Sequence, residues 1–170
     1  MKIDAIQKMI REVPNFPKEG VLFKDITPIL EDGKAFQSLA KIMAEHVHPS
    51  TNKLVAIESR GFILGAAVAQ HLSCGLVLVR KPGKLPRPTI RENYLLEYGS
   101  DSLEIHADSL TKDDQITIID DVLATGGTAS AVEKLCHKLG ANVLGSLFLL
   151  EILALEGRKK LTQPSQSLFN

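Results

Sequence analysis

The sequence has no excess charge of either sign. Its 20 Lys and Arg residues are balanced by 20 Asp and Glu residues, which gives a formal net charge of +0 at pH 7. A chain without a net field does not attract nucleic acid or an anionic membrane through its overall charge. We therefore expect neither partner, and we expect any anion to bind at a local patch.

Cysteines and long apolar runs are also scarce. Cys74 and Cys136 lie far apart, with no Cys-x-x-Cys pair and no histidine at ligand spacing. This pattern favours buried thiols in a reducing compartment over a disulfide or a zinc site. No apolar run approaches the roughly 18 residues of a membrane span, and residues 1–7 carry a charge inside what would be the apolar region of a signal peptide. We expect a cytoplasmic protein without a membrane segment.

The length of 170 residues fits one domain, 1–170, and no internal repeat divides it. Near the N-terminus, apolar residues from Ile3 to Val13 recur at helical spacing and predict a short helix that Pro14 stops. Residues 15–28 mix apolar side chains with Pro and Gly, which predicts ordered but irregular structure. Helix is expected again over 33–47.

Two stretches have the pattern of a β-α-β unit, in which short apolar runs flank a helical segment. The expected strands are 54–57, 75–79, one that ends at Asp121, and 143–150. The expected helices are 63–71 and about 128–139. Buried strands joined by helices predict an α/β fold with a central, mostly parallel sheet flanked by helices. Because ligands of such sheets bind beyond the carboxyl ends of the strands, the loops after Ile57, Val79 and Asp121 should converge on one site.

Between the two units, residues 80–91 contain three prolines, one glycine and five cations, a composition that excludes a helix or a central strand. Residues 95–98 and 103–106 predict the two edge strands of an antiparallel ribbon. We interpret 80–106 as a flexible flap that closes over a site and neutralises a departing polyphosphate. A solvated charged face is the plain alternative. The cations are Arg80, Lys81, Lys84, Arg87 and Arg91.

The most informative motif runs from Asp120 to Thr128. An apolar strand ends in two adjacent carboxylates, and Thr-Gly-Gly-Thr then leads into a helix. Glycines allow a backbone to approach a ligand closely, and the free N–H groups of a helix N-terminus favour an anion. The Gly-Lys-Ser/Thr ending of a nucleotide triphosphatase loop is absent. We therefore predict a loop for one phosphate, with Asp120 and Asp121 accepting from the hydroxyls of the attached sugar. A simple tight strand-to-helix connection is the alternative.

A second turn of the same kind follows the first buried strand. Residues 58–62, Glu-Ser-Arg-Gly-Phe, precede a helix, so backbone N–H groups there can face a second anion. Arg60 adds a forked cation suited to phosphate oxygens. An ordinary surface arginine before a helix is the alternative for Arg60. At the end of the flap, Glu97 is either an exposed edge-strand residue or a group that contacts a reacting base or a cationic sugar ring.

With these motifs assembled, the sequence resembles the type I phosphoribosyltransferases, and among them the adenine phosphoribosyltransferase family. The match runs almost end to end. The segments that carry it are 16–28, 58–62, 80–86, 96–99 with 103–105, 120–128 and 157–161. The Asp-Asp and Thr-Gly-Gly-Thr pattern marks only the superfamily, whereas the N-terminal segment and Leu96-Glu-Tyr-Gly99 narrow the resemblance.

The resemblance implies a type I phosphoribosyltransferase fold with an N-terminal hood over residues 1–32 and an antiparallel flap. It also implies a purine salvage reaction in which adenine and 5-phosphoribosyl 1-diphosphate give AMP and diphosphate, with Mg²⁺ as the cofactor. A homodimer is implied as well, with some flap cations supplied by the other subunit. Asp120 would contact the metal at most through water.

Residue roles follow from the same resemblance. The 5-phosphate would be held by Ala124, Thr125, Gly126, Gly127 and Thr128, and the ribose would be bound by Asp120 and Asp121, which would act in catalysis with Glu97, the candidate acid/base. Diphosphate would be bound by Ser59, Arg60, Arg80, Lys81 and Lys84. Adenine would be covered by Val21, Leu22, Phe23 and Lys24, with Phe16 stacking nearby.

Two positions bear on the choice of base. Related 6-oxopurine enzymes carry an aspartate at the place of Ala124 and a lysine near the final strand, whereas residues 147–152 here contain no lysine. A pocket without these groups favours an aminopurine. Transfer to another purine remains an alternative, and so does a regulator that senses phosphoribosyl diphosphate without chemistry. The chain has neither the added length nor the basic surface expected of such a regulator.

Overall fold

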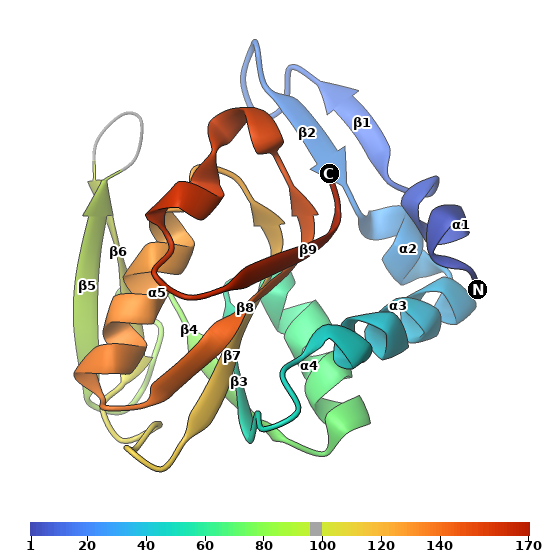
Figure 1. The fold of residues 1–170 in the computed structure, drawn as a ribbon. Helices are drawn as coiled ribbons and strands as arrows, with labels where there is room; N and C mark the ends of the chain where they lie inside the picture. The colour runs from blue at the N-terminus through green and yellow to red at the C-terminus, as the bar shows by residue number, and fades with distance from the viewer. Residues whose placement is uncertain (96–99) are drawn as a thin grey trace.

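The computed structural model describes residues 1–95 and 100–170, and it is built around a five-stranded parallel sheet (Figure 1). The strand order is β4-β3-β7-β8-β9. The strands are β3 (Lys53–Ile57), β4 (Gly75–Val79), β7 (Gln115–Leu123), β8 (Asn142–Glu151) and β9 (Ser165–Phe169). Apolar side chains cover both faces of this sheet, which explains why its strands read as continuous apolar runs.

Helices and a ribbon cover the two faces of the sheet (Figure 1). One core packs α1 (Ile3–Gln7), α2 (Thr27–Glu31), α3 (Gly33–His46) and α4 (Arg60–Leu72) on one face. The other core packs α5 (Gly127–Lys138) and the ribbon of β5 (Thr89–Leu95) and β6 (Ser100–His106) on the opposite face. The predicted central parallel sheet flanked by helices, with a separate antiparallel flap, is confirmed.

The N-terminal helix prediction is wrong beyond its first turns. The helix ends at Gln7, and residues Arg11–Pro14 form β1, which pairs antiparallel with β2 (Leu22–Asp25). The segment 15–28, predicted to be irregular, therefore contains most of a hairpin and the start of α2. All four residues of β1 are exposed, so the hairpin has no buried face to impose an alternating pattern on the sequence.

The antiparallel ribbon of the flap is confirmed, but its strands differ from those predicted: β5 ends at Leu95, where the first strand was expected to begin, and β6 begins at Ser100, earlier than the expected 103. Residues 96–98 of the first predicted strand lie outside the described residues. Strands β5 and β6 pair from Thr89 with His106 to Leu95 with Ser100. Arg80 extends this sheet by an isolated bridge to Glu104. The prolines end at Pro88, and strand pairing starts at the next residue, which agrees with the inability of proline to donate to a ladder.

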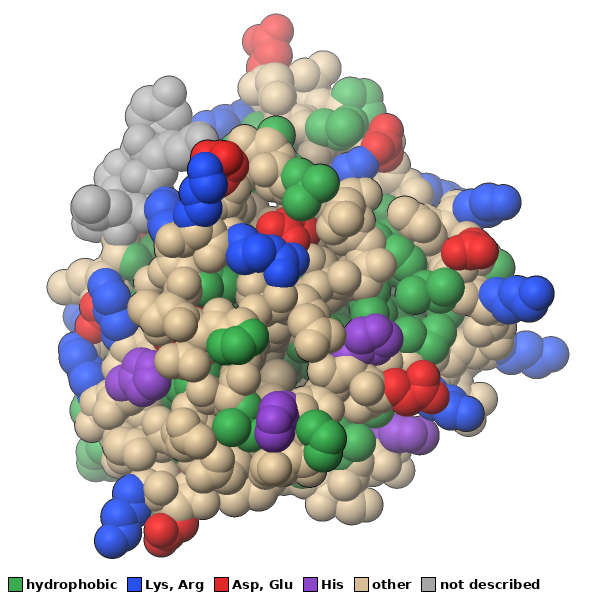
Figure 2. Space-filling model, viewed as in Figure 1, with side chains coloured by type: hydrophobic (Ala, Val, Ile, Leu, Met, Phe, Trp, Pro, Cys, Tyr) green, Lys and Arg blue, Asp and Glu red, His purple; other side chains and the backbone are tan. Residues whose placement is uncertain are grey.

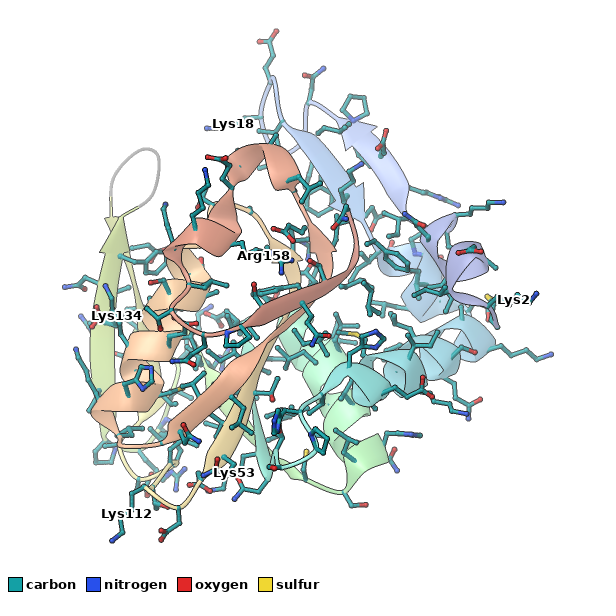
Figure 3. All side chains as sticks on the ribbon, in the orientation of Figure 1. Lys2, Lys18, Lys53, Lys112, Lys134 and Arg158 are labelled. Atoms are coloured by element: carbon teal, nitrogen blue, oxygen red, sulfur yellow. The ribbon has the colours of Figure 1, made fainter. Side chains whose placement is uncertain are left out.

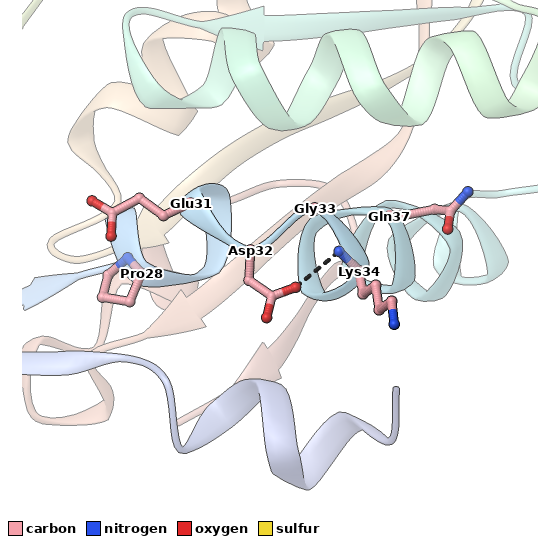
Figure 4. A pocket seen from close by; sticks show the side chains of 6 residues that line it. All are labelled: Pro28, Glu31, Asp32, Gly33, Lys34 and Gln37. Carbon is pink, nitrogen blue, oxygen red and sulfur yellow. Dashed lines mark hydrogen bonds between the residues drawn. The ribbon is translucent and has the colours of Figure 1, made fainter.

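Helix α3 shows how local sequence sets a boundary. Asp32 accepts hydrogen bonds from the backbone N–H groups of Lys34 and Ala35, both at 2.9 Å, and so caps the helix (Figure 4). The open pocket beside this cap is lined by Pro28, Glu31 and Gln37 among others (Figure 4). It lies on the α2–α3 junction and contains none of the predicted site residues.

Candidate functional site

The strand order reverses next to β3, because the chain passes from β3 to β4 on one side and later to β7 on the other. At such a switch point the loops leave a crevice beyond the carboxyl ends of the strands. The loops after β3, β4 and β7 carry Glu58 to Arg60, Arg80 to Lys84 and Ala124 to Gly126. The fold therefore brings the three predicted anion-binding segments to one edge of the sheet.

Arg60, at the tip of β3, contacts both the end of β7 and the hood. Its Nε atom lies 2.5 Å from Oδ2 of Asp121, and its guanidinium carbon lies 4.7 Å from the ring centroid of Phe23 in the hood. Asp121 Oδ2 has no aligned hydrogen bond, so the contact with Arg60 is an attraction between charges. The tip of β3, the end of β7 and the hood thus meet at Arg60.

The loop predicted to hold phosphate has the geometry that the motif requires. Strand β7 continues to Leu123, and α5 begins at Gly127, one residue earlier than predicted. Gly126 adopts φ 77° at the N-cap of α5, a left-handed conformation that L side chains rarely adopt. Together with the free N–H groups of the first helical turn, this loop offers a concave surface of donors to an anion.

The two adjacent aspartates have different surroundings, because successive side chains of a strand point to opposite faces. Asp120 lines a cavity of about 70 Å³ with the phosphate loop and Phe148, whereas Asp121 is 6% exposed and contacts Arg60. Burial, followed by the negative charge of Asp121, raises the pKa of Asp120 well above its usual value. A cation or a hydroxyl donor in the cavity would relieve this unfavourable charge.

The flap cations are engaged by carboxylates. Glu58 accepts hydrogen bonds from Arg80 Nε at 3.1 Å and from the backbone N–H of Lys81 at 2.6 Å, and Lys84 Nζ lies 3.9 Å away. The Lys81 ammonium pairs with Asp101. Sequence reasoning assigned no role to Glu58 or Asp101. The only signal for Glu58 was its place beside Ser59 and Arg60 at a strand end.

A second buried carboxylate, Glu104, organises the same turn from the ribbon. It accepts hydrogen bonds from Gly83 N at 3.0 Å and from Arg91 Nε at 3.0 Å. The side chain of Arg91, followed by the backbone N–H of Gly83, lowers the pKa of Glu104. Arg87 pairs with the exposed Asp108 at 3.1 Å. The turn at 80–84 is therefore held from two sides, and its cations carry bound counter-charges.

The hood residues Val21 to Lys24 lie on and beside β2. Leu22 is 47% exposed and Phe16 is 50% exposed, while the rings of Phe16 and Phe23 meet edge to face with centroids 5.1 Å apart. The side chain of Lys24 pairs with Glu12 across the hairpin. The hood thus offers exposed apolar surface beside Arg60, and Lys24 is left with its backbone groups for a ligand.

Glu97, the predicted acid/base residue, lies outside the described residues. Within residues 1–95 and 100–170, no three His, Cys, Asp or Glu side chains gather to hold a metal ion, and no helix there is long and apolar enough to cross a membrane. On the face in Figure 2, Lys and Arg side chains are interspersed with Asp and Glu.

Known proteins are similar to this chain in sequence and in fold. The family model for the phosphoribosyl transferase domain matches residues 25–165. The adenine phosphoribosyltransferase of Geobacter metallireducens is 51% identical over 160 residues, which cover 94% of each chain.

Two solved structures extend the comparison. The adenine phosphoribosyltransferase of Thermoanaerobacter pseudethanolicus superimposes with a TM-score of 0.96, at 47% identity over 99% of both chains. The Saccharomyces cerevisiae enzyme, complexed with adenine and an imino-altritol bisphosphate, has a TM-score of 0.94 at 37% identity, over 98% of this chain and 97% of that one. The chain therefore belongs to the phosphoribosyl transferase domain family, within its adenine phosphoribosyltransferases.

Proposed function

We propose that the chain transfers the 5-phosphoribosyl group of 5-phosphoribosyl 1-diphosphate to N9 of adenine, which forms AMP and diphosphate in purine salvage. The observation that carries this proposal is the small cavity in which Asp120 faces the Thr-Gly-Gly-Thr loop at the switch point of the sheet. The similarity to adenine phosphoribosyltransferases over nearly the whole chain supports the same reaction.

The 5-phosphate binds to the backbone N–H groups and hydroxyls of residues 124–128. Asp120, in the same cavity, accepts from a ribose hydroxyl, and Asp121 reaches the sugar from the side of Arg60. Diphosphate binds at Ser59 and Arg60.

The flap cations act on the diphosphate after their carboxylate partners release them. Arg80 and Lys84 must separate from Glu58, and Lys81 from Asp101. The cations exchange their carboxylate partners for the diphosphate, but Glu58, whose side chain is only 8% exposed, loses its partners, so binding of the anion must offset this cost. A hinge at the turn 80–84 would allow this movement, within a flap that spans 80–106.

Adenine lies under the hood, against Val21, Leu22 and Phe23 and the backbone of Lys24. The exposed ring of Phe16 and the edge-to-face contact of Phe16 with Phe23 extend this apolar surface. Backbone groups of the hood read the amino edge of the base, and the methyl group of Ala124 offers no hydrogen bond to a 6-oxo group.

The reaction separates charge, so electrostatics dominates the mechanism. The bond from C1 of the ribose to the diphosphate oxygen breaks as N9 of adenine attacks from the other face, and the sugar ring becomes cationic in the transition state, as in other glycosyl transfers. Asp120 and Asp121 stabilise that positive charge, while Arg60 and the flap cations stabilise the leaving diphosphate. Glu97 acts as the acid/base group that exchanges a proton with adenine.

Asp120 is the residue that would face a magnesium ion, through a water molecule, because the raised pKa of its carboxyl indicates an environment in which added positive charge is favourable. When bound, Mg²⁺ neutralises charge on the leaving group. We further propose that residues 1–170 act as one catalytic domain, with residues 1–32 as its N-terminal helix and hood, in a cytoplasmic homodimer whose partner subunit contributes flap cations.

The test is an incubation of the purified chain with phosphoribosyl diphosphate, Mg²⁺ and one purine at a time. We expect AMP and diphosphate with adenine, and no mononucleotide with hypoxanthine, guanine or xanthine. Turnover of one of these bases in place of adenine would show that the base assignment is wrong. Binding of phosphoribosyl diphosphate by calorimetry without any product would instead indicate a regulator.

A further inference from the structure

The phosphate loop is in direct backbone contact with a distant segment of the chain. A Cβ atom built on Gly126 would lie 2.1 Å from the carbonyl oxygen of Gly157, and a Cβ on Gly157 would lie 2.1 Å from the carbonyl oxygen of Ala124 and 2.8 Å from Gly126 N. Real Cβ atoms do not approach other atoms this closely. The two glycines therefore allow residue 157 to press backbone to backbone on the loop.

Gly157 begins the short 3-10 helix η2 (Gly157–Lys160), which follows η1 (Leu153–Leu155) after β8. The next residue, Arg158, fixes the position of η2. The side chain of Arg158 is labelled in Figure 3. Its guanidinium group pairs with Glu151 at the end of β8 and donates to Ser167 Oγ of β9 at 2.9 Å and to the carbonyl oxygen of Ser165. Glu151 is only 4% exposed and its pKa is lowered, chiefly by Arg158.

The residues that follow η2 are hydrogen-bonded to α5, the helix that comes directly after the phosphate loop. Glu133 of α5, which is 1% exposed, accepts hydrogen bonds from Thr162 N and Thr162 Oγ1, both at 2.9 Å, and from Gln163 N at 3.2 Å. At the near end, Ile152 N donates to the carbonyl oxygen of Leu123, the residue before the loop, at 2.9 Å.

Between these ties, Leu161, the residue after η2, packs on a small apolar cluster of Leu123, Ala129 and Phe148. The same three residues line the cavity of Asp120 and the phosphate loop. Segment 151–163, which we name the brace, thus contacts the loop directly through Gly157 and packs through Leu161 on residues that flank the loop.

We propose that the brace positions the phosphate loop, so that Gly157 and Arg158 are positioning residues for the 5-phosphate although neither needs to contact it. The inference rests on the proposed role of residues 124–128. A loop whose N–H groups must all point at one anion loses affinity when its backbone moves, because a hydrogen bond weakens steeply once its donor is out of line with the acceptor.

Two variants disturb the brace by different means. Arg158→Met removes the fork that joins η2 to Glu151 and β9, and Gly157→Ala introduces a methyl group where only 2.1 Å is available. We expect the KM for phosphoribosyl diphosphate and the Kd for ribose 5-phosphate to rise about tenfold in Arg158→Met and up to about a hundredfold in Gly157→Ala, the range for the loss of one hydrogen bond to a charged group. The KM for adenine and kcat should change little.

Lys159→Met is the matched control. Lys159 stands in the same helix and loses the same charge, but its ion pair among the described residues is with the exposed Glu156. Its ribose 5-phosphate affinity should stay within about twofold of wild type, because exposed pairs contribute little. Arg158→Lys should restore part of the affinity, since a lysine keeps the charge but not the fork.

Folded Arg158→Met and Gly157→Ala proteins, checked by thermal melting, that both bind ribose 5-phosphate as tightly as wild type would overturn the brace. A Thr128→Val variant separates this result from a failure of the phosphate assignment. If Thr128→Val weakens ribose 5-phosphate binding and the brace variants do not, the brace alone is wrong. If the wild-type chain does not bind ribose 5-phosphate, the assignment of the loop falls too, and the brace with it.

Discussion

Replacing Asp121 by Asn is expected to lower kcat by about 10²–10³-fold, the range seen when one group that stabilises transition-state charge is removed. Asp121 is 6% exposed and lies 2.5 Å from Arg60, so its negative charge is held in place, and in the proposed complex it lies near the sugar ring that becomes cationic. Asparagine has the same shape but no charge. Steady-state kinetics with adenine and phosphoribosyl diphosphate measures the effect.

The substitution also frees Arg60 from its counter-charge. Ground-state binding of diphosphate should therefore not weaken, and the loss should appear in kcat and not in the KM for phosphoribosyl diphosphate. Asp108→Asn is the matched control, because Asp108 also pairs with an arginine, Arg87, but both side chains are more than half exposed. Near-normal turnover of Asp121→Asn, with an unchanged melting temperature, would remove Asp121 from the catalytic group.

The central sheet could be predicted because its strands are buried on both faces. Strands β3, β4, β7 and β8 each contain a run of mostly apolar, largely buried residues, which is the pattern of strands in a parallel sheet covered on both faces. The turn between β7 and α5 was also predictable, since a glycine at φ 77° and a helix start leave a recognisable pattern in the local sequence. An apolar run and a glycine turn can both be recognised within one short segment of sequence, without knowledge of its partners in the fold.

The edge elements could not be predicted for the opposite reason. Strand β9, Ser-Gln-Ser-Leu-Phe, is paired on one side only and buries mainly Phe169, so its sequence gave no readable signal. Residues Met9 to Val13 continued an apparent helical period, but the chain turned there into an exposed hairpin with β2. In both cases the partner strand, and not the local sequence, determines the structure.

The same distinction applies to the site. The arginines and lysines of the flap could be identified as anion-binding candidates from composition, but their carboxylate partners Glu58, Asp101 and Glu104 depend on how β3, β5 and β6 are placed. The contact of Gly157 with Gly126 joins residues 31 positions apart, and no local pattern marks it. Long-range charge pairing and close packing of backbones were visible only in the folded chain.

Asp120→Asn should lower the activity of the protein but raise its stability. Burial and the charge of Asp121 raise the pKa of Asp120 in the folded chain above its ordinary value of 3.8. Between these two pKa values the folded state keeps a proton that the unfolded state releases, so the stability linked to this group is present at acidic pH and is lost as the pH rises through the raised pKa. Asparagine does not ionise and avoids this loss.

We therefore expect Asp120→Asn to melt about 2–4 °C above wild type at neutral to alkaline pH, a shift of roughly 1 kcal/mol for a chain of this size. The difference should shrink as the pH falls toward 4. Turnover should drop about a hundredfold, because the carboxylate that faces the sugar is gone.

Melting curves of both proteins from pH 4 to 9 measure this difference directly. Carboxylates whose pKa is lowered by their partners, such as Glu104 and Glu151, destabilise both proteins alike as the pH falls, so they cancel in the comparison. A gap between the two melting temperatures that stays constant with pH would show that Asp120 carries no buried charge penalty. An active site that holds this carboxylate near the sugar trades stability for catalysis, and the expected opposite signs of the two effects follow from that trade.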